Sequence, residues 1–368
     1  MNVTTSTHAG YTARRKPPTA EGLPYTEDHS ARFEVGEYRF FCVFDGHGGD
    51  ETSSALARIV PRLARELFET SGSVDAVGSV ESGLLLLFER IDAEIASSGL
   101  DGLDGLDGLT GLDGLTKGGA TCNVTVVHAP TMVMTVASLG DSPTLVYERH
   151  ESHESHERQA SHESHESHER QASQEPYVLA FRTKDQDCAD EEERARLRAL
   201  GLYVFEQRVV APDGSTHATG VFRCRTAGGT DTSTMSSFGD AAHDVPRGAV
   251  NKVPRVYPGQ RLKPASVVLV CSDGCMEHLA PFSPTLIKPS ADARADEIAG
   301  HIGDYFALGS SSDYKTMGLA AYITERQIES IARARHCARG ASGPEYDSDR
   351  AWVEREFDNQ TVFAIHVD

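Results

Sequence analysis

The chain lacks the features that mark membrane-spanning, secreted and nucleic-acid-binding proteins. None of its apolar runs approaches the roughly 18 residues that a membrane span needs. The N-terminal segment MNVTTSTHAGYTARRKPP has no apolar signal-peptide core, and Asn2 excludes the Met-Gly start of N-myristoylation. The 35 basic and 55 acidic residues give a net charge of −20, whereas a general nucleic-acid binder needs a basic face. We therefore expect a protein that binds neither nucleic acid nor membrane.

Cysteine pairs with the spacing of a zinc site or a disulfide framework are also missing. The chain has seven cysteines, an odd number, scattered along its length. Cys271 and Cys275 flank Asp273 and Gly274, and no second pair is present to complete a zinc site. The pattern indicates reduced, mostly buried thiols and a cytoplasmic or nuclear protein.

Two tandem repeats interrupt the chain. Residues 100–117 read LDGLDGLDGLTGLDGLTK, and residues 150–173 read HESHESHERQAS twice. Glycine disfavours a helix in the first repeat, and the second has no apolar face to offset the entropy of ordering it. Its histidines and glutamates could also chelate zinc or nickel adventitiously. We interpret both repeats as solvated loop insertions in a single domain that spans residues 1–368.

The rest of the chain alternates between apolar, strand-like runs and helical patterns. The strand-like runs are Tyr38–Phe44, Thr121–Val127, Thr131–Leu139, Thr144–Tyr147, Tyr177–Phe181, Ser266–Cys271 and Thr361–Val367. The helical patterns are Glu51–Glu69, Ser79–Ala96, Asp190–Leu200, Ala291–Ala307 and Thr324–Ala338. Pro61 is expected to kink the first helix or to start a new one. Because the strands cluster in short meanders, an α+β fold with antiparallel sheets is favoured.

Carboxylates stand next to several of the strand-like runs. They are Asp45 in FFCVFDGHGG, Asp273 in SVVLVCSDGC, Asp358 in FDNQTVFAIHV, Asp141 in MVMTVASLGDS, and Glu27 and Asp28 in PYTEDHS. Any one of them is typical of an ordinary turn. As a set, they can converge at the ends of strands, where their mutual repulsion requires a hard cation. Mg²⁺ and Mn²⁺ prefer such all-oxygen sites.

Eight segments, in chain order, carry a resemblance to a known family. They are TEDHSARF, FFCVFDGHGG, GGATCNVTVV, VASLGDSPTLVY, TKDQDCADEEERARLRALG, MSSFGD, VVLVCSDGCMEHL and FDNQTVFAIHV. Together they resemble the motifs of the metal-dependent protein phosphatases of the PPM type (protein phosphatase 2C). The resemblance implies a four-layer αββα sandwich of two antiparallel β-sheets flanked by helices. It also implies phosphoprotein substrates, and we expect a monomer.

The resemblance assigns roles to the residues of these motifs. Asp45 would bridge two divalent ions, Mg²⁺ or Mn²⁺, and the Gly46 carbonyl would bind one of them. Glu27, Asp273 and Asp358 would complete the second ion's ligands.

Three more positions would support these ligands. Asp28 would hold metal-bound water. Asp141, Asp273 and Glu277 would form a third, weaker metal site, in which Glu277 replaces the usual aspartate.

The implied chemistry is hydrolysis of phosphoserine or phosphothreonine. Two cations can lower the pKa of a bridging water and aim it at phosphorus. His47, whose ordinary pKa is about 6.5, could protonate the departing oxygen. Taken alone, outside this motif, His47 is more typical of a plain turn.

The chain departs from the family at the expected phosphate-binding arginine, where Leu23 stands. Arg14, Arg15 or Lys16 could replace it if the intervening prolines loop out. Gln186 and Ser236 stand where the family has histidine and arginine. Two alternatives therefore stay open: a metal-binding pseudophosphatase that acts as a regulatory or docking module, and an unrelated metal-dependent hydrolase.

Overall fold

The structure is a computed structural model, and ten ranges of the chain are described. They are residues 1–8, 26–69, 79–98, 118–150, 177–210, 215–241, 243–276, 291–308, 317–338 and 360–367. The predicted insertions at 100–117 and 150–173 lie outside these ranges, except for His150.

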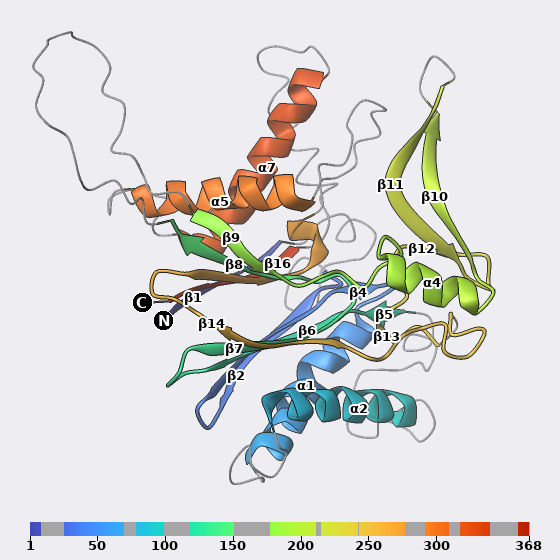
Figure 1. Cartoon of the computed structure of the whole chain (residues 1–368), viewed down its shortest axis with the longest axis horizontal. Helices are drawn as coiled ribbons and strands as arrows, with labels where there is room; N and C mark the ends of the chain where they lie inside the picture. The colour runs from blue at the N-terminus through green and yellow to red at the C-terminus, as the bar shows by residue number, and fades with distance from the viewer. Residues whose placement is uncertain are drawn as a thin grey trace, which may run out of the picture.

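Two five-stranded antiparallel sheets stack face to face (Figure 1). The first runs in the order β14 (Arg255–Arg261), β7 (Val133–Leu139), β6 (Cys122–His128), β3 (Tyr38–Phe44) and β2 (His29–Val35). The second runs in the order β1 (Asn2–His8), β16 (Gln360–His366), β15 (Val267–Cys271), β8 (Thr144–Arg149) and β9 (Tyr177–Arg182).

Helices cover the outer face of each sheet. The first sheet is covered by α1 (Glu51–Glu69) and α2 (Val80–Ser98), and the second by α5 (Ala291–Ala307) and α7 (Leu319–Ala338) (Figure 1). The predicted four-layer αββα sandwich is therefore confirmed. Helix α1 is continuous, so Pro61 does not start a new helix.

Strand β3 shows why the predicted strands are so apolar. Side chains alternate between the two faces of a strand. Phe40 and Phe44 pack in the core beneath α1 and α2, whereas Phe41 and Val43 pack in the core between the two sheets. Because both faces of β3 are covered, the strand is hydrophobic at every position from Phe40 to Phe44. Asp45 directly follows this buried strand.

Several strands were not predicted, because they lack a continuous apolar run. They are β1, β2, β14 and the hairpin of β10 (Tyr203–Val210) and β11 (Thr216–Arg225). Strands β1, β2, β14 and β10 are sheet edges, where one side of the strand has no neighbour to bury it. Strand β14 also contains Pro258 and Gly259 at a register shift between Tyr257 and Gln260.

The β10–β11 hairpin stands beside the sandwich with α4 (Glu191–Ala199) (Figure 1). Asp190 caps this helix by accepting a hydrogen bond from the Glu192 backbone amide. A small separate core, which includes Leu197, Val204 and Cys224, joins the helix to the hairpin. The predicted helix at Asp190–Leu200 is thus confirmed, with its two outer residues as caps.

Six of the seven cysteines are buried and unpaired, as the sequence predicted. They are Cys42, Cys122, Cys188, Cys224, Cys271 and Cys275. Burial raises the pKa of Cys42 well above its ordinary range, which makes it a poor nucleophile.

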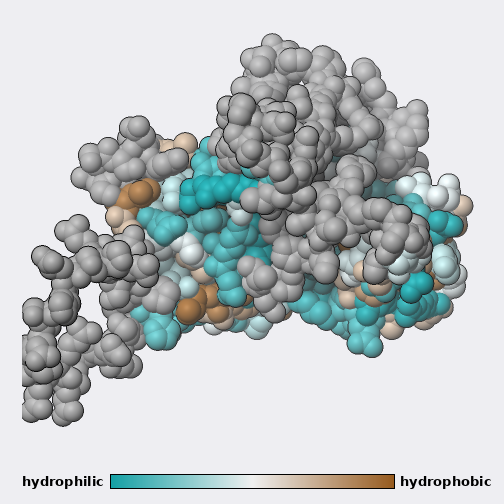
Figure 2. All heavy atoms as spheres, turned by 90° about the horizontal axis from the view of Figure 1, so that it is seen from above, coloured by the Kyte–Doolittle hydropathy of each residue, from teal (hydrophilic) through white to brown (hydrophobic). Residues whose placement is uncertain are grey.

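The surface of the described part is mainly hydrophilic. On the face seen from above, the coloured surface is largely teal, with brown side chains in small separate groups (Figure 2). None of the described helices is both long enough and apolar enough to cross a bilayer.

Phe41 offers a test of the inter-sheet core. It is fully buried and packs edge-to-face on Phe363 of the second sheet, with ring centroids 5.9 Å apart. We expect Phe41→Ala to lower the free energy of unfolding in urea by about 3–5 kcal/mol, because it leaves a cavity between the sheets. Val253, 65% exposed, provides the control: Val253→Ala should change that value by about 0.5 kcal/mol or less. Similar losses in both variants would contradict this account of the core.

Candidate active site

Asp45 and Asp273 come together where the two sheets meet. Asp45 follows β3 of the first sheet, and Asp273 begins a 3₁₀ turn (Asp273–Cys275) just after β15 of the second. The Asp273 backbone amide lies 3.4 Å from Asp45 Oδ2. Thr121 holds the Asp45 backbone from the neighbouring strand, since its amide donates to the Asp45 carbonyl at 2.9 Å. Residues 228 positions apart in the chain thus share one site.

Glu27 and Gly46 are pressed against each other beside this pair. A Cβ atom at Gly46 would collide with the Glu27 carbonyl oxygen and would lie 2.8 Å from Ser53 Oγ. Ser53, at the start of α1, donates a 2.5 Å hydrogen bond to the same Glu27 carbonyl. The absence of a side chain at Gly46 therefore lets the Glu27 segment lie directly over the end of β3. Asp28, next to it, is only 2% exposed.

Asp141 lies after β7, at the turn into β8. Gly140 precedes it with φ +98°, a conformation that favours glycine. Asp141 Oδ2 accepts a 2.5 Å hydrogen bond from Thr234 Oγ. Gly140 is also packed tightly, because a Cβ atom there would lie 2.6 Å from a Thr121 methyl group. Thr121 therefore links the Asp45 segment to the Asp141 turn.

His47 pairs with a residue to which the sequence analysis gave no role. Its Nε2 lies 2.7 Å from Oδ2 of Asp240, the last residue of the MSSFGD segment. Asp240 is 2% exposed, and its Oδ2 also accepts a 2.5 Å hydrogen bond from Ser237. Three short strands, β4 (Gly46–His47), β5 (Gly119–Ala120) and β13 (Phe238–Gly239), form the small sheet that brings the two residues together.

The charges around His47 and Asp240 favour an ion pair. Burial lowers the pKa of His47, but the hydrogen bond and charge of Asp240, with the charges of Asp141 and Glu27, bring the net pKa above its ordinary value. Burial alone would raise the pKa of Asp240; its hydrogen bonds from His47 and Ser237 and the nearby His243 bring it below the ordinary value. The charges of three acidic residues, Asp240, Asp141 and Glu27, thus act on His47.

The remaining predicted site residues lie outside the described residues. They are Glu277, Asp358, Leu23 and the candidate phosphate-binding residues Arg14, Arg15 and Lys16. Among the residues that are described, no three acidic, histidine or cysteine side chains are grouped closely enough to hold a metal ion. The described carboxylates are oxygen donors that suit Mg²⁺ or Mn²⁺, and the predicted site needs Asp358 to complete its ligands.

The two other departures from the family pattern are packing residues. Gln186 is 5% exposed and donates to the Val253 carbonyl at 3.3 Å. Ser236 is fully buried, 3.5 Å from Glu193 of α4, and Arg196 of the same helix pairs with that glutamate at 2.6 Å. None of these hydrogen bonds involves Asp45, Asp273 or His47.

A family model for protein phosphatase 2C matches residues 26–281 of the chain. The chain belongs to the protein phosphatase 2C family. A search of the curated proteins finds no match.

Solved structures of related fold agree with this protein phosphatase 2C assignment. A serine-threonine phosphatase 2C from Toxoplasma gondii matches with a TM-score of 0.57 and 16% identity, over 100% of this chain and 94% of that one. A C. elegans sex determining protein matches with a TM-score of 0.56 and 17% identity, over 100% of this chain. This chain spans 65% of the length of the latter protein. At such low identity these matches show the fold alone.

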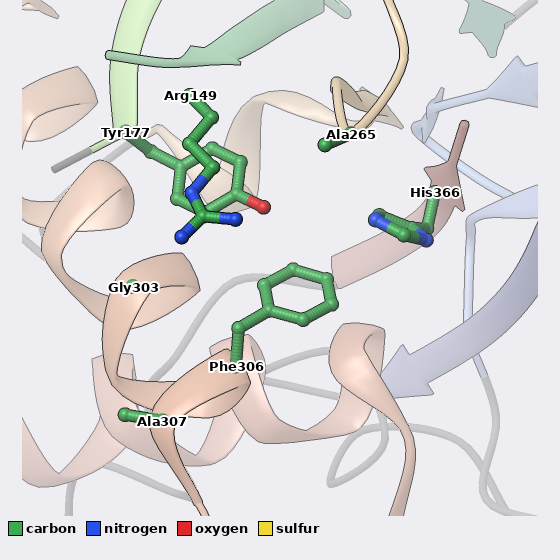
Figure 3. A pocket seen from close by; sticks show the side chains of 7 residues that line it. All are labelled: Arg149, Tyr177, Ala265, Gly303, Phe306, Ala307 and His366. Carbon is green, nitrogen blue, oxygen red and sulfur yellow. The ribbon is translucent and has the colours of Figure 1, made fainter. Parts of the chain in front are cut away.

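A cavity of about 380 Å³ lies at the other end of the second sheet. It is lined by Arg149 at the end of β8, Tyr177 at the start of β9, His366 at the end of β16, and Phe306 of α5 (Figure 3). Asp273 follows the opposite end of the neighbouring strand β15. The cavity therefore contains none of the predicted catalytic or metal-binding residues of this protein phosphatase 2C member.

Gly119 tests the geometry of the His47–Asp240 pair. A Cβ atom there would collide with the Asp240 carboxylate and lie 2.6 Å from His47 Nε2. We expect Gly119→Ala to separate the pair, which would abolish the hydrogen-bonded His47 Nε2 signal in NMR spectra of ¹⁵N-histidine-labelled protein. Gly300 of α5 has open space around its Cβ position, so Gly300→Ala is the matched control. A His47 signal that is unaltered in Gly119→Ala would contradict the described contact.

Proposed function

We propose that this protein phosphatase 2C member hydrolyses phosphoserine and phosphothreonine in proteins with the help of two divalent metal ions, and that it does so as a single domain. The observation that carries the proposal is the meeting of Asp45 and Asp273, which follow strands of two different sheets: the Asp273 backbone amide lies 3.4 Å from Asp45 Oδ2. A hard divalent cation fits the carboxylate oxygens that these two residues supply.

The residues that would hold the ions follow from the site and from the family pattern. Asp45, the Gly46 carbonyl, Glu27, Asp273 and Asp358 would bind the two central ions. When bound, such ions supply a nucleophilic water at neutral pH and neutralise charge on the phosphoryl oxygens.

A second group of side chains would complete the centre. Asp141, Asp273 and Glu277 would hold a third, weaker ion. Asp28, which is 2% exposed, would position metal-bound water.

His47 would give a proton to the departing serine or threonine oxygen. Its Nε2 is held by Asp240 at 2.7 Å, so Nδ1 is the nitrogen that would face the leaving group. The acidic surroundings that raise the pKa of His47 favour the protonated ring that a general acid needs. Asp240 also fixes the ring's orientation, so that the proton is delivered from one position.

The pseudophosphatase alternative rests on one sequence feature, Leu23 at the position of the family's phosphate-binding arginine. A leucine cannot form the bidentate contact that an arginine makes to phosphate. Such a protein would bind metal ions but would not turn over a phosphorylated substrate.

Metal-dependent hydrolysis of a phosphopeptide tests the proposed function. We expect turnover of p-nitrophenyl phosphate and of a phosphothreonine peptide with Mn²⁺ or Mg²⁺, and loss of turnover with EDTA. Asp45→Asn and Asp273→Asn should both lose it, whereas Asp296→Asn, an exposed change on α5, should keep it. Turnover that persists in EDTA or in both site variants would refute the metal mechanism. Metal binding without turnover, seen by calorimetry, would favour the pseudophosphatase.

The role of His47 has a separate test. His47→Ala should lower kcat by about 100- to 10,000-fold for a peptide substrate, because a general acid contributes that much. The loss should be smaller with p-nitrophenyl phosphate, whose leaving group needs no proton. Equal losses for both substrates would argue against a proton donor.

A further inference from the structure

The side chain of Lys252 contacts the turn that carries Asp240. Its ammonium group donates to the carbonyl of Ser237 at 2.6 Å and to the carbonyl of Gly239 at 2.8 Å. The backbone next to it reinforces this contact, because the Ser237 amide donates to the Asn251 carbonyl at 3.2 Å. Lys252 thus binds the carbonyls of the two residues that flank Phe238, just before Asp240.

The turn needs such support, because its backbone is not relaxed. Gly239 has φ +77° and Asp240 has φ +55°, so two successive residues adopt the left-handed conformation. This conformation is less favourable for a residue with a side chain, such as Asp240, than it is for glycine. It also turns the Asp240 carboxylate towards His47, and the Asp240 amide then donates to the Gly118 carbonyl at 3.2 Å.

We infer that Lys252 is a positioning residue: through its two hydrogen bonds it keeps Asp240 against His47. The inference rests on the proposed phosphatase function. Lys252 itself contacts neither the metal-binding carboxylates nor the leaving group; it acts through the backbone of Ser237 and Gly239.

Three carboxylates act on the ammonium group of Lys252: Asp92 of α2, and Asp240 and Asp244 of the turn. Burial lowers the pKa of Lys252 below that of an ordinary lysine, and the three carboxylates offset this only in part. In its charged form the ammonium group makes charge-assisted hydrogen bonds to the two carbonyls.

The kinetic experiment compares kcat and KM of wild type and of Lys252 variants at pH 7. Lys252→Met should lower kcat by about 10-fold and leave KM unchanged, since orienting partners of site residues have effects of this size. Lys252→Arg should restore part of kcat, because its guanidinium group also donates charged hydrogen bonds. Lys263→Met, at an exposed lysine paired with Glu148, is the control and should match wild type.

Two kinetic results would overturn the inference. One is a folded Lys252→Met variant with the kcat of wild type. The other is a variant in which KM rises and kcat stays the same. If wild type shows no metal-dependent turnover at all, the proposed function fails, and the role of Lys252 is then decided by the structural measurement below.

That measurement needs no activity. In NMR spectra of ¹⁵N-histidine-labelled protein at pH 7, the hydrogen-bonded Nε2 signal of His47 should be weaker in Lys252→Met than in wild type, while circular dichroism shows that both chains are folded. A His47 signal that is the same in both proteins would overturn the inference.

Discussion

Acidic side chains that repel one another are gathered at one end of this sandwich, and the rest of the structure keeps them there. Asp45 and Asp273 leave strands of different sheets, and the packing of Phe41 and Val43 between those sheets sets the distance between them. The backbone carbonyl of Glu27 accepts a hydrogen bond from the Ser53 hydroxyl group of α1. Burial of the apolar cores thus offsets the cost of bringing like charges together.

The fold resolves this repulsion by different means at different carboxylates. Asp141 and Asp240 each accept a short hydrogen bond from a threonine or serine hydroxyl, and Asp240 also faces His47. Hydrogen bonds to the charged form favour ionisation even where burial opposes it. The Asp273 amide lies against the Asp45 carboxylate at the sheet boundary, where the proposed metal ions would bind. In this proposal Asp240 orients His47, whereas Asp45, Asp273 and Asp141 would bind cations.

Glycines let these groups approach each other. Gly46 allows the Glu27 carbonyl to lie over β3, and Gly119 leaves room for the contact between His47 and Asp240. At both positions a single methyl group would occupy space that a polar atom of the site already holds. The glycines of FFCVFDGHGG and GGATCNVTVV are thus explained by close approach as well as by turn formation.

The sequence by itself determined the sandwich, the helices on its faces and most of the acidic residues at its end. Strands such as β3 could be predicted because burial on both faces requires an unbroken apolar run. The edge strands β1 and β14 could not, since an exposed edge imposes no such pattern. Only the tertiary structure decided that Asp240 partners His47 and that Lys252 supports it. His47 and Asp240 are 193 positions apart in the chain, so their spacing does not predict that they meet. Lys252 lies 13–15 positions from Gly239 and Ser237 and binds their backbone carbonyls, which every residue has, so the contact leaves no pattern in the sequence.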